Sequence, residues 1–451
     1  MNTEMSRRTL IGGVATTTLA SQVPLPARAA PTGIAARYKS LADRIDVDGA
    51  LAFLSSTVRQ KSFSDTEGEN ALAKWMVDAM RTNIPGIQAT AQAYAGKPGG
   101  KLKTRYNAIG RLPGTGGGKS ILFNGHIDTN PVTEGWTVDP FAGLVRNDAV
   151  YGIGVSNMKA GNAAYFWALR ELVKAGVRLK GDVILTFVTA ELGGGLGTQA
   201  VVDGNYRADY FINSEPTDLV ALTMHAISGP IDIELIGVTR HLSKRGEAVD
   251  ALAAACDLVP RLNAMTFTGA QSAEHASINR GHVGVIHGAL GRQLDEWRPP
   301  QVADYAVVKG SARYAPGQTH DGVMDDIDLQ LAALKAQYPG LMANNLGRAK
   351  PPVGPKAKGF FVDPKSPIVR AVNEAYLAVR GVEQPTGPGH TQARYYGTDA
   401  PILQNDGKME GLVCGPGGKF NTMPDERVEI ADYLDMIRIY MLTIADICGV
   451  A

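Results

Sequence analysis

Ser120-Ile-Leu-Phe-Asn-Gly-His-Ile-Asp-Thr129 is the stretch that decides the fold of this chain. Its apolar run, Ile121 to Phe123, is typical of a buried strand, and the glycine that soon follows lets the backbone turn sharply. His126 and Asp128 come next, so in extended backbone their side chains lie on one side. α/β proteins commonly bind ligands at the carboxyl ends of strands. Taken alone, a hydrogen-bonded loop histidine beside a capping aspartate would explain this pair equally well.

Two later strands also end close to acidic residues. An apolar run at residues 182–188 stops just before Glu191 and a glycine-rich segment, and a short strand at residues 210–213 is followed by Glu215. The carboxyl ends of parallel strands meet at one edge of a sheet. We therefore expect Glu191 and Glu215 to share one crevice with the histidine and aspartate that follow the first strand.

The size and charge of the chain limit its architecture and its partners. Its 451 residues exceed what one hydrophobic core usually holds, so two domains are expected. The net charge of +1, from 45 basic and 44 acidic residues, gives no attraction for nucleic acid or for a membrane surface. The three cysteines, Cys256, Cys414 and Cys448, are widely spaced and predict neither a disulfide framework nor a zinc knuckle.

Residues 1–30 are predicted to be an export signal. Paired arginines, Arg7 and Arg8, precede a modest apolar stretch, and Ala27-Arg28-Ala29 has the small-x-small pattern of a cleavage site. The apolar stretch is too short to span a bilayer. The segment resembles a twin-arginine signal, which predicts a periplasmic or otherwise extracytoplasmic protein. A plain basic N-terminal tail is the alternative.

Hydrophobic periodicity predicts the elements around these strands. Apolar residues at helical spacing predict helices within residues 45–82 and at residues 162–175, 248–262, 323–337, 367–379 and 430–447. Apolar or alternating runs predict further strands at residues 106–110, 231–235 and 305–308. This mixture of helices and strands indicates an α/β fold.

Six motifs of the chain resemble those of one enzyme family and occur in the same order. They are GHIDT, YGIGVSNMKAG, TAELGGGLGT, SEPTDL, GVTRH and CGPGGKFNTMPDE. The sequence resembles the dinuclear-zinc metallopeptidase family of aminoacylases, glutamate carboxypeptidases and succinyl-diaminopimelate desuccinylases. The resemblance implies a catalytic α/β domain, with a mixed sheet covered by helices, interrupted by a smaller α/β lid that usually dimerises. The catalytic domain would comprise residues 31–228 and 349–451, and the lid residues 229–348.

The resemblance also implies roles for individual residues. His126 would bind one metal ion, Asp128 would orient this histidine, and Glu215 would complete the same metal site. Glu191 would be the general base that takes a proton from the attacking water. His241 would reach from the lid into the cleft of a partner subunit and stabilise the oxyanion.

Three positions depart from the pattern of the family. Asn157 stands at the position of the metal-bridging aspartate, Leu192 at that of a second glutamate, and Asn421 at that of the C-terminal histidine ligand. Catalytic zinc normally needs three firm protein ligands, and only His126 and Glu215 remain as remnants of that set. A dinuclear centre is therefore not expected in this chain.

Further residues are expected to bind the substrate. Arg313 stands where the family often has an arginine that pairs with a substrate carboxylate. Asn157, Asn421, Glu215 and His390 would line the same pocket, although a solvated loop residue is the alternative for the last of these. The expected partners are thus a small molecule that carries a carboxylate and a second copy of the chain, bound through the lid.

Three functions are compatible with these residues. The first is an exported enzyme that has lost the dinuclear centre and uses Glu191, with Asp128, His126 and His241, for acid–base chemistry without a cofactor. Loss of Lewis acidity then favours hydrolysis of an ester, lactone or activated amide, or lyase or isomerase chemistry beside a carbonyl. The second is an amidohydrolase or peptidase that acts on an N-acyl amino acid or small peptide with one weakly held divalent ion, such as zinc. The third is a binding protein for a small acid.

Overall fold

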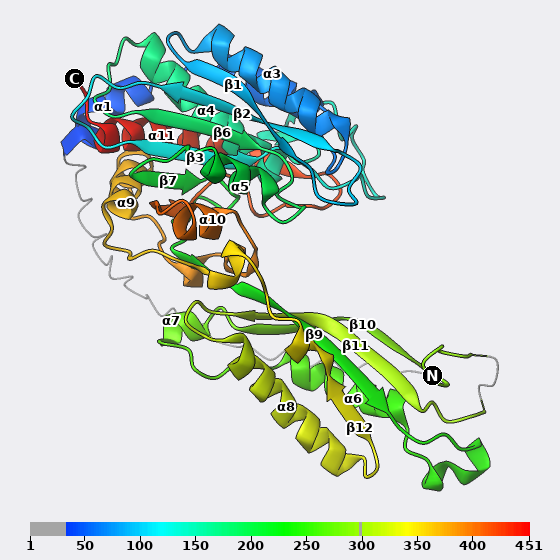
Figure 1. The fold of residues 1–451 in the computed structure, drawn as a ribbon. Coiled ribbons are helices and arrows are strands. Elements are labelled where there is room, and N and C mark those ends of the chain that lie inside the picture. Colours follow the sequence, from blue (N-terminus) through cyan, green and yellow to red (C-terminus); the bar gives the residue numbers. More distant parts are fainter. Residues whose placement is uncertain (1–32, 297–299) are drawn as a thin grey trace, which may run out of the picture.

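The structure is a computed structural model, and it describes residues 33–296 and 300–451. The predicted export signal lies outside the described residues. The described residues form two large hydrophobic cores and one small cluster: residues 42–222 and 360–448 contribute to the first core, residues 227–341 to the second, and Met224, Ala226, Ile278 and Ala315 form the cluster. The chain thus forms a larger domain and a smaller inserted domain, the predicted lid, which extends away from it (Figure 1).

A six-stranded sheet forms the centre of the larger domain, with its strands in the order β1-β2-β6-β3-β7-β14. The strands are β1 (Gln88–Ala95), β2 (Thr104–Leu112), β3 (Ile121–His126), β6 (Val183–Val188), β7 (Tyr210–Asn213) and β14 (Glu410–Val413). From β6 to β14 neighbouring strands run parallel, whereas β1 pairs antiparallel with β2 and β2 pairs antiparallel with β6. The sheet is therefore mixed, as the predicted fold class requires.

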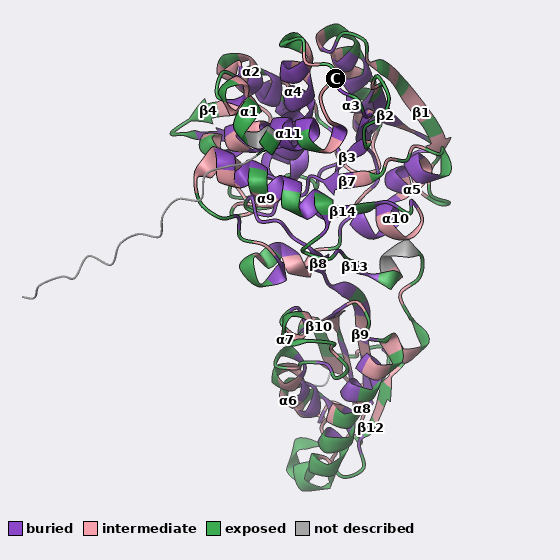
Figure 2. Ribbon diagram, turned by 90° about the vertical axis from the view of Figure 1, so that its left-hand side faces the viewer, coloured by how far each residue is buried: buried purple, intermediate pink, exposed green. Residues whose placement is uncertain are grey.

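Helices cover both faces of this sheet (Figure 2). They are α1 (Gly33–Ala42), α2 (Val47–Arg59), α3 (Glu67–Asn83), α4 (Ala160–Lys174), α5 (Leu196–Asp203), α9 (Pro367–Arg380), α10 (Ala400–Asn405) and α11 (Ile430–Cys448). α11 packs against α4 and α9, while α3 packs against β1 and β2. Every residue of β3 and β6 is buried, because parallel strands between two helical layers have no solvated face.

The lid contains a four-stranded antiparallel sheet in the order β10-β11-β9-β12. Its strands and helices are β9 (Ile227–Ile236), α6 (Ala251–Asn263), α7 (Ala273–Ala276), β10 (Arg280–Ala289), β11 (Tyr305–Tyr314), α8 (His320–Gln337) and β12 (Met342–Asn345). Ile231, Ile233 and Leu235 alternate along β9 and are buried in the core of the lid. This alternation is typical of a sheet with one face packed on helices.

Two small sheets complete the fold. β8 (Met224–His225) pairs with β13 (Phe360–Phe361) where the chain passes between the larger domain and the lid (Figure 2). β5 (Ala149–Tyr151) pairs with both β4 (Leu144–Arg146) and β15 (Arg427–Glu429). This second sheet ties the segment before α4 to the segment before α11, and both segments reach the candidate site.

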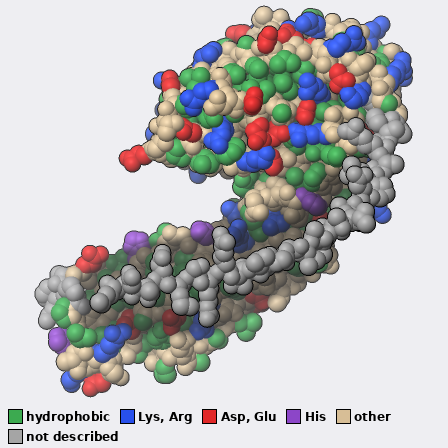
Figure 3. Space-filling view, turned by 180° about the vertical axis from the view of Figure 1, so that it is seen from behind, with side chains coloured by type: hydrophobic (Ala, Val, Ile, Leu, Met, Phe, Trp, Pro, Cys, Tyr) green, Lys and Arg blue, Asp and Glu red, His purple; other side chains and the backbone are tan. Residues whose placement is uncertain are grey.

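The surface carries charges of both signs. On the face shown in Figure 3, acidic and basic side chains are interspersed over both domains. This mixture agrees with the net charge of +1. Within residues 33–296 and 300–451, no helix combines the length and the apolar character needed to cross a bilayer.

Candidate active site

His126 is the last residue of β3 and is buried at the carboxyl edge of the sheet. Its Nδ1 lies 2.9 Å from the main-chain oxygen of Asp128, and because a carbonyl oxygen only accepts, this nitrogen carries a proton. Its Nε2 lies 3.1 Å from Oδ1 of Asn157 and 3.8 Å from Oε1 of Glu215. The local backbone thus fixes the ring, which faces two other predicted site residues.

The surroundings of His126 favour its charged form. Burial opposes a charge on the ring, but the carboxylates of Glu215, Asp128 and Glu191 outweigh burial and raise the pKa of His126 to about 9. The nearest oxygen of the Asp128 carboxylate is 3.6 Å from Nδ1. Negative side chains therefore surround this end of the strand.

Asp128 holds the loop that carries Glu191. Its Oδ1 accepts a hydrogen bond of 3.1 Å from the main-chain N–H of Glu191, and its Oδ2 accepts another of 3.1 Å from that of Leu192. The hydroxyl of Ser64 also donates to Oδ2, at 3.2 Å. The sequence predicts that this aspartate orients His126; in the structure its main-chain oxygen binds the imidazole, while its carboxylate binds the loop. One residue therefore couples the positions of the histidine and the glutamate.

Glu69, which no sequence motif singles out, supports the same loop. Its Oε1 accepts a hydrogen bond of 3.1 Å from the N–H of Ala190, whose φ of 59° is uncommon for a residue other than glycine. Its other oxygen forms an ion pair with the buried Arg105. Burial and, next, the nearby Asp128 raise the pKa of Glu69 to about 7. Glutamate is common in the first turn of a helix, so its sequence position gives no sign of this role.

Glu426 organises the segment that carries Asn157. Its carboxylate accepts hydrogen bonds of 2.9 Å from the main-chain N–H groups of Gly154, Ser156 and Asn157. Burial raises the pKa of Glu426 to about 7, although these donors and the nearby Lys159 favour the ionised form. The position of Asn157 is therefore fixed from its backbone, independently of any ligand.

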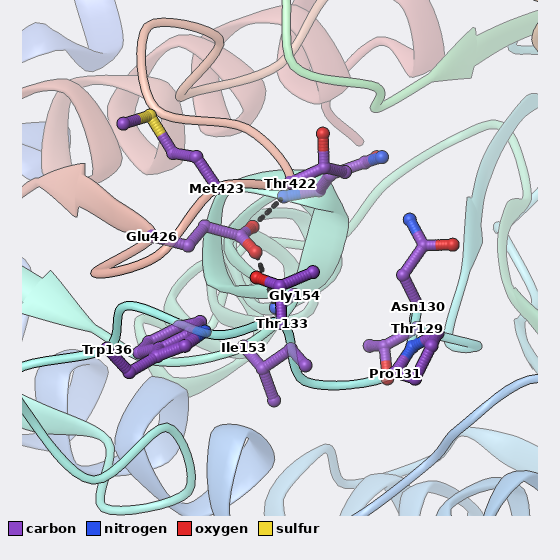
Figure 4. A pocket seen from close by; sticks show the side chains of 11 residues that line it. Thr129, Asn130, Pro131, Thr133, Trp136, Ile153, Gly154, Thr422, Met423 and Glu426 are labelled. Atoms are coloured by element: carbon purple, nitrogen blue, oxygen red, sulfur yellow. Dashed lines mark hydrogen bonds between the residues drawn. The ribbon is translucent and has the colours of Figure 1, made fainter.

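A small, mainly apolar pocket adjoins this segment (Figure 4). Its volume is about 250 Å³, and its apolar lining includes Trp136, Ile153 and Met423. Asn157 and Thr422 line this pocket and also a larger cavity. The apolar pocket therefore lies directly beside that cavity.

The larger cavity, of about 510 Å³, contains most of the predicted site residues. Those that line it are His126, Asn157, Glu191, Glu215, Arg313 and Asn421, and Leu192 lines it as well. Arg313 belongs to β11 of the lid, whereas the others come from the larger domain. Burial lowers the pKa of the Arg313 guanidinium below its ordinary value. The fold thus brings together residues from both sides of the lid insertion and from the lid itself.

Three predicted residues do not line this cavity. Asp128 is fully buried behind it. His241 is exposed on the lid, where its Nδ1 lies 3.0 Å from the hydroxyl of Ser243. His390 is exposed and lines an adjoining polar pocket, which shares Lys419 with the cavity. The structure of one chain therefore assembles the predicted site without its two outlying histidines.

Comparison with known proteins identifies the family. Residues 122–446 match Peptidase family M20/M25/M40. The chain belongs to this family. It is 27% identical over 347 residues to a succinyl-diaminopimelate desuccinylase from Gluconobacter oxydans, an alignment that covers 72% of this chain and 81% of that protein. Over 147 residues it is 32% identical to an N-formyl-4-amino-5-aminomethyl-2-methylpyrimidine deformylase from Bacillus subtilis, which covers 30% of this chain and 34% of the deformylase.

Solved structures agree with this assignment to the M20/M25/M40 family. Human carnosine dipeptidase 1 superimposes with a TM-score of 0.66 at 13% identity, over 93% of this chain and 100% of that one. A dinuclear metal binding peptidase of the M20 family from Bacillus subtilis gives a TM-score of 0.57 at 16% identity, over 91% and 98% of the two chains. The chain therefore has the fold of the M20 peptidases and amidohydrolases, and its relatives in sequence are hydrolases.

The donors in the cavity do not fit a pair of metal ions. Leu192 offers no ligand atom, and both ends of the Asn421 amide already have hydrogen-bonding partners. His126 and Glu215 remain as firm donors, which is one short of the usual set for catalytic zinc. We therefore derive no catalytic step through a dinuclear centre.

A group of three acidic side chains near the cavity does not replace that centre. Among the described residues, it is Asp218, Glu429 and Asp432 whose carboxylates lie close enough together to share an ion. The ammonium group of Lys419 is within 4 Å of all three. The lysine therefore already pairs with all three carboxylates and offsets part of their charge.

Proposed function

We propose that this member of the M20/M25/M40 family is an enzyme that uses Glu191 for acid–base chemistry without a dinuclear metal centre. The proposal rests on a contrast within the site. Asp128 and Glu69 hold the loop of Glu191 through three hydrogen bonds of 3.1 Å from main-chain N–H groups. By contrast, Leu192 and Asn421 stand where the family places metal ligands and supply none. The support for a proton-transferring carboxylate is thus retained, and the support for two metal ions is not.

Arg313 indicates the class of substrate. It is the arginine among the residues that line the cavity, and its planar guanidinium binds carboxylates through two parallel hydrogen bonds. A small molecule that carries a carboxylate and a reactive carbonyl would place the first group against Arg313 and the second near Glu191. The cavity volume of about 510 Å³ is within the range of sites for small molecules.

A mechanism without two metal ions limits the kinds of substrate that the site can convert. In hydrolysis, Glu191 would take a proton from water as its oxygen attacks the carbonyl carbon, and would return the proton to the leaving group. Without Lewis-acid catalysis the transition state lacks several kcal/mol of stabilisation, so an unactivated amide is a poor substrate. Ester, lactone or activated-amide hydrolysis, or lyase or isomerase chemistry beside a carbonyl, fits this site better.

A second candidate is supported by the convergence of three side chains. Nε2 of His126 lies within 4 Å of oxygen atoms of both Asn157 and Glu215. One weakly held divalent ion at this point would give a single-metal amidohydrolase acting on an N-acyl amino acid or small peptide. The names of relatives such as the desuccinylase are in keeping with that chemistry.

We further propose that the mature protein is an exported homodimer that associates through the lid. His241 is exposed on the lid and does not line the cavity of its own chain, so a partner's cleft is the site where it could act. β10 is an edge strand of the lid sheet and pairs with β11 alone among the described strands. Unpaired edge strands are common sites of association between copies of a chain.

Two substitutions separate the two candidate functions. Glu191→Gln keeps the size of the side chain but cannot cycle a proton, and general acid–base loss costs about a hundredfold to ten-thousandfold in rate. Glu215→Gln removes a remnant metal ligand and should be the milder change if no metal is used. Both variants would be assayed on carboxylate-bearing nitrophenyl esters and N-acyl amino acids, with thermal melts to check folding. A larger loss in Glu215→Gln than in Glu191→Gln would contradict the metal-free proposal.

A further inference from the structure

A chain of hydrogen bonds leads from the backbone of the larger domain to a tyrosine in the cavity. The N–H of Gly418 donates to Oγ of Ser156 at 3.1 Å. The Ser156 hydroxyl in turn donates to Oδ1 of Asn421, and Nδ2 of Asn421 donates to the hydroxyl oxygen of Tyr396 at 3.2 Å. Asn421 and Tyr396 both line the cavity that contains Glu191 and Arg313.

The orientation of the Asn421 amide sets the direction of these hydrogen bonds. Its Oδ1 faces Ser156 and its NH₂ group faces Tyr396. The main-chain N–H of Gly418 donates to Oγ of Ser156, which leaves the proton of that hydroxyl for Oδ1 of Asn421. Since the phenol oxygen accepts that hydrogen bond, its proton is available to another acceptor. Among the described residues, no hydrogen bond from the Tyr396 hydroxyl to a protein acceptor is found.

We propose that Tyr396 is a catalytic residue that donates a hydrogen bond to the carbonyl oxygen of the substrate. Asn421 and Ser156 act as positioning residues for it. This inference rests on the proposed function, because it assigns the electrophilic group that a reaction without a metal pair requires. Asn421, at the position of a histidine ligand, would thus have a role of its own, since its amide orients the Tyr396 hydroxyl in the same cavity.

The step can be written with all atoms accounted for. Glu191 takes one proton from water while the water oxygen bonds to the carbonyl carbon, and the π electrons move to the carbonyl oxygen, which accepts a hydrogen bond from Tyr396. The tetrahedral intermediate then re-forms its C=O bond as the bond to the leaving oxygen breaks. That oxygen receives the proton from Glu191, and the phenol keeps its own proton throughout. The net reaction is ester plus water to acid plus alcohol.

A structural role predicts a different kinetic result. If the Tyr396 hydroxyl served to hold Asn421 in place, its removal would disturb the shape of the cavity, and substrate binding would weaken. A hydrogen bond to the developing oxyanion strengthens in the transition state, so its loss lowers kcat with little change in KM. Loss of one oxyanion donor typically costs about a hundredfold to a thousandfold in kcat.

The test compares Tyr396→Phe with Tyr395→Phe in the full chain. The Tyr395 hydroxyl donates to the main-chain oxygen of Ser277 at 3.5 Å, so the second variant removes an adjacent hydroxyl that already has a protein acceptor. With 4-nitrophenyl hydrogen succinate as the probe and chelator-treated protein, we expect Tyr396→Phe to lose about a hundredfold in kcat with KM changed by less than about threefold. Tyr395→Phe should retain kcat within about threefold. Equal kcat values for the two variants, or a loss in Tyr396→Phe that lies wholly in KM, would overturn the assignment.

The Ser156→Ala substitution is the second part of this test. It should lower kcat by about tenfold, and adding it to Tyr396→Phe should cause little further loss, because the two residues act through one hydroxyl. Full additivity would contradict the positioning role. Loss of wild-type turnover on chelation would refute the proposed function instead. The same pair of tyrosine variants would then be compared in metal-loaded protein, where equal kcat values would still overturn the role of Tyr396.

Discussion

At the scale of single residues, Asp128 determines the geometry of the site. Its main-chain oxygen accepts from the His126 ring, and its carboxylate accepts from the backbone on which Glu191 stands. The side chain has no exposed surface, so water cannot replace these hydrogen bonds without rearrangement. A change at this position should therefore disturb the relative placement of imidazole and carboxylate.

Asp128→Asn tests this coupling. Asparagine keeps one acceptor oxygen but places an NH₂ group against a main-chain N–H, so one buried donor loses its partner. We expect kcat to fall by at least about tenfold and the free energy of unfolding to fall by about 1–3 kcal/mol. Steady-state kinetics and denaturant titration would measure both effects. Asp139→Asn is the matched control, because Asp139 also accepts from a main-chain N–H, at 2.9 Å, but in an exposed turn; wild-type kinetics for Asp128→Asn would contradict the account.

Restoring metal ligands tests whether Asn157, Leu192 and Asn421 stand at the ligand positions of the family. Asn157→Asp, Leu192→Glu and Asn421→His together would supply three firm ligands in the cavity that already contains His126 and Glu215. We expect the triple variant to bind zinc with a stoichiometry well above that of the parent, measured by elemental analysis after gel filtration. If its zinc content equals that of the parent, the alignment of these positions with metal ligands is wrong.

At the scale of elements, the sequence predicts those helices and strands that have a clear apolar pattern. The strand expected at residues 210–213 is β7, and the helix expected at residues 430–447 is α11, because both are strongly apolar and buried. β1 was not predicted, since its Ala- and Gln-rich sequence has little of the β-branched character typical of strands. β10 contains three glycines, which weaken the pattern of a strand.

The residues of the candidate site likewise fall into those that the sequence predicts and those that it does not. Residues of the quoted motifs, such as Glu191 and Asn421, were predicted to meet and do line one cavity. Glu69 and Tyr396 were missed because their importance lies in contacts with segments distant in the sequence, which no local pattern encodes. His241 remains a prediction, since its proposed role requires a partner subunit.

A substitution of Glu426 tests whether this residue anchors the segment before α4. Glu426→Gln leaves the packing volume unchanged but weakens the acceptor of three buried main-chain donors. The free energy of unfolding should fall by about 1–3 kcal/mol, measured by chemical denaturation. Glu429→Gln is the control: that side chain is only partly buried and pairs with Lys419, so its loss should change stability by less than about 1 kcal/mol. Equal effects of the two substitutions would contradict the anchoring role.

At the scale of the whole molecule, the cavity belongs to both domains. Arg313 reaches it from β11, whereas Glu191 reaches it from the loop after β6. The lid is therefore part of the site and not an appendage. The exposed His241, on the same lid, would then connect two such sites if the lids of two copies associate.

Mixed dimers test whether the site is shared. Homodimers of Glu191→Gln and of His241→Ala should each be nearly inactive. If His241 acts in the partner's cleft, dissociation and reassembly of an equal mixture should restore about a quarter of wild-type activity, because half of the dimers then carry one complete site. Analytical ultracentrifugation would confirm the dimer. A monomeric protein with full activity, or a mixture without any recovery, would refute the shared site.

The central claim, catalysis by Glu191 without a dinuclear centre, is tested most directly by the metal content of active protein. The protein would be purified, its bound metal measured by elemental analysis, and its turnover followed before and after exhaustive chelation. The account predicts well below one metal ion per chain and a turnover that chelation leaves unchanged. One or two tightly bound ions per chain, with activity that disappears on chelation and returns when the metal is restored, would contradict it.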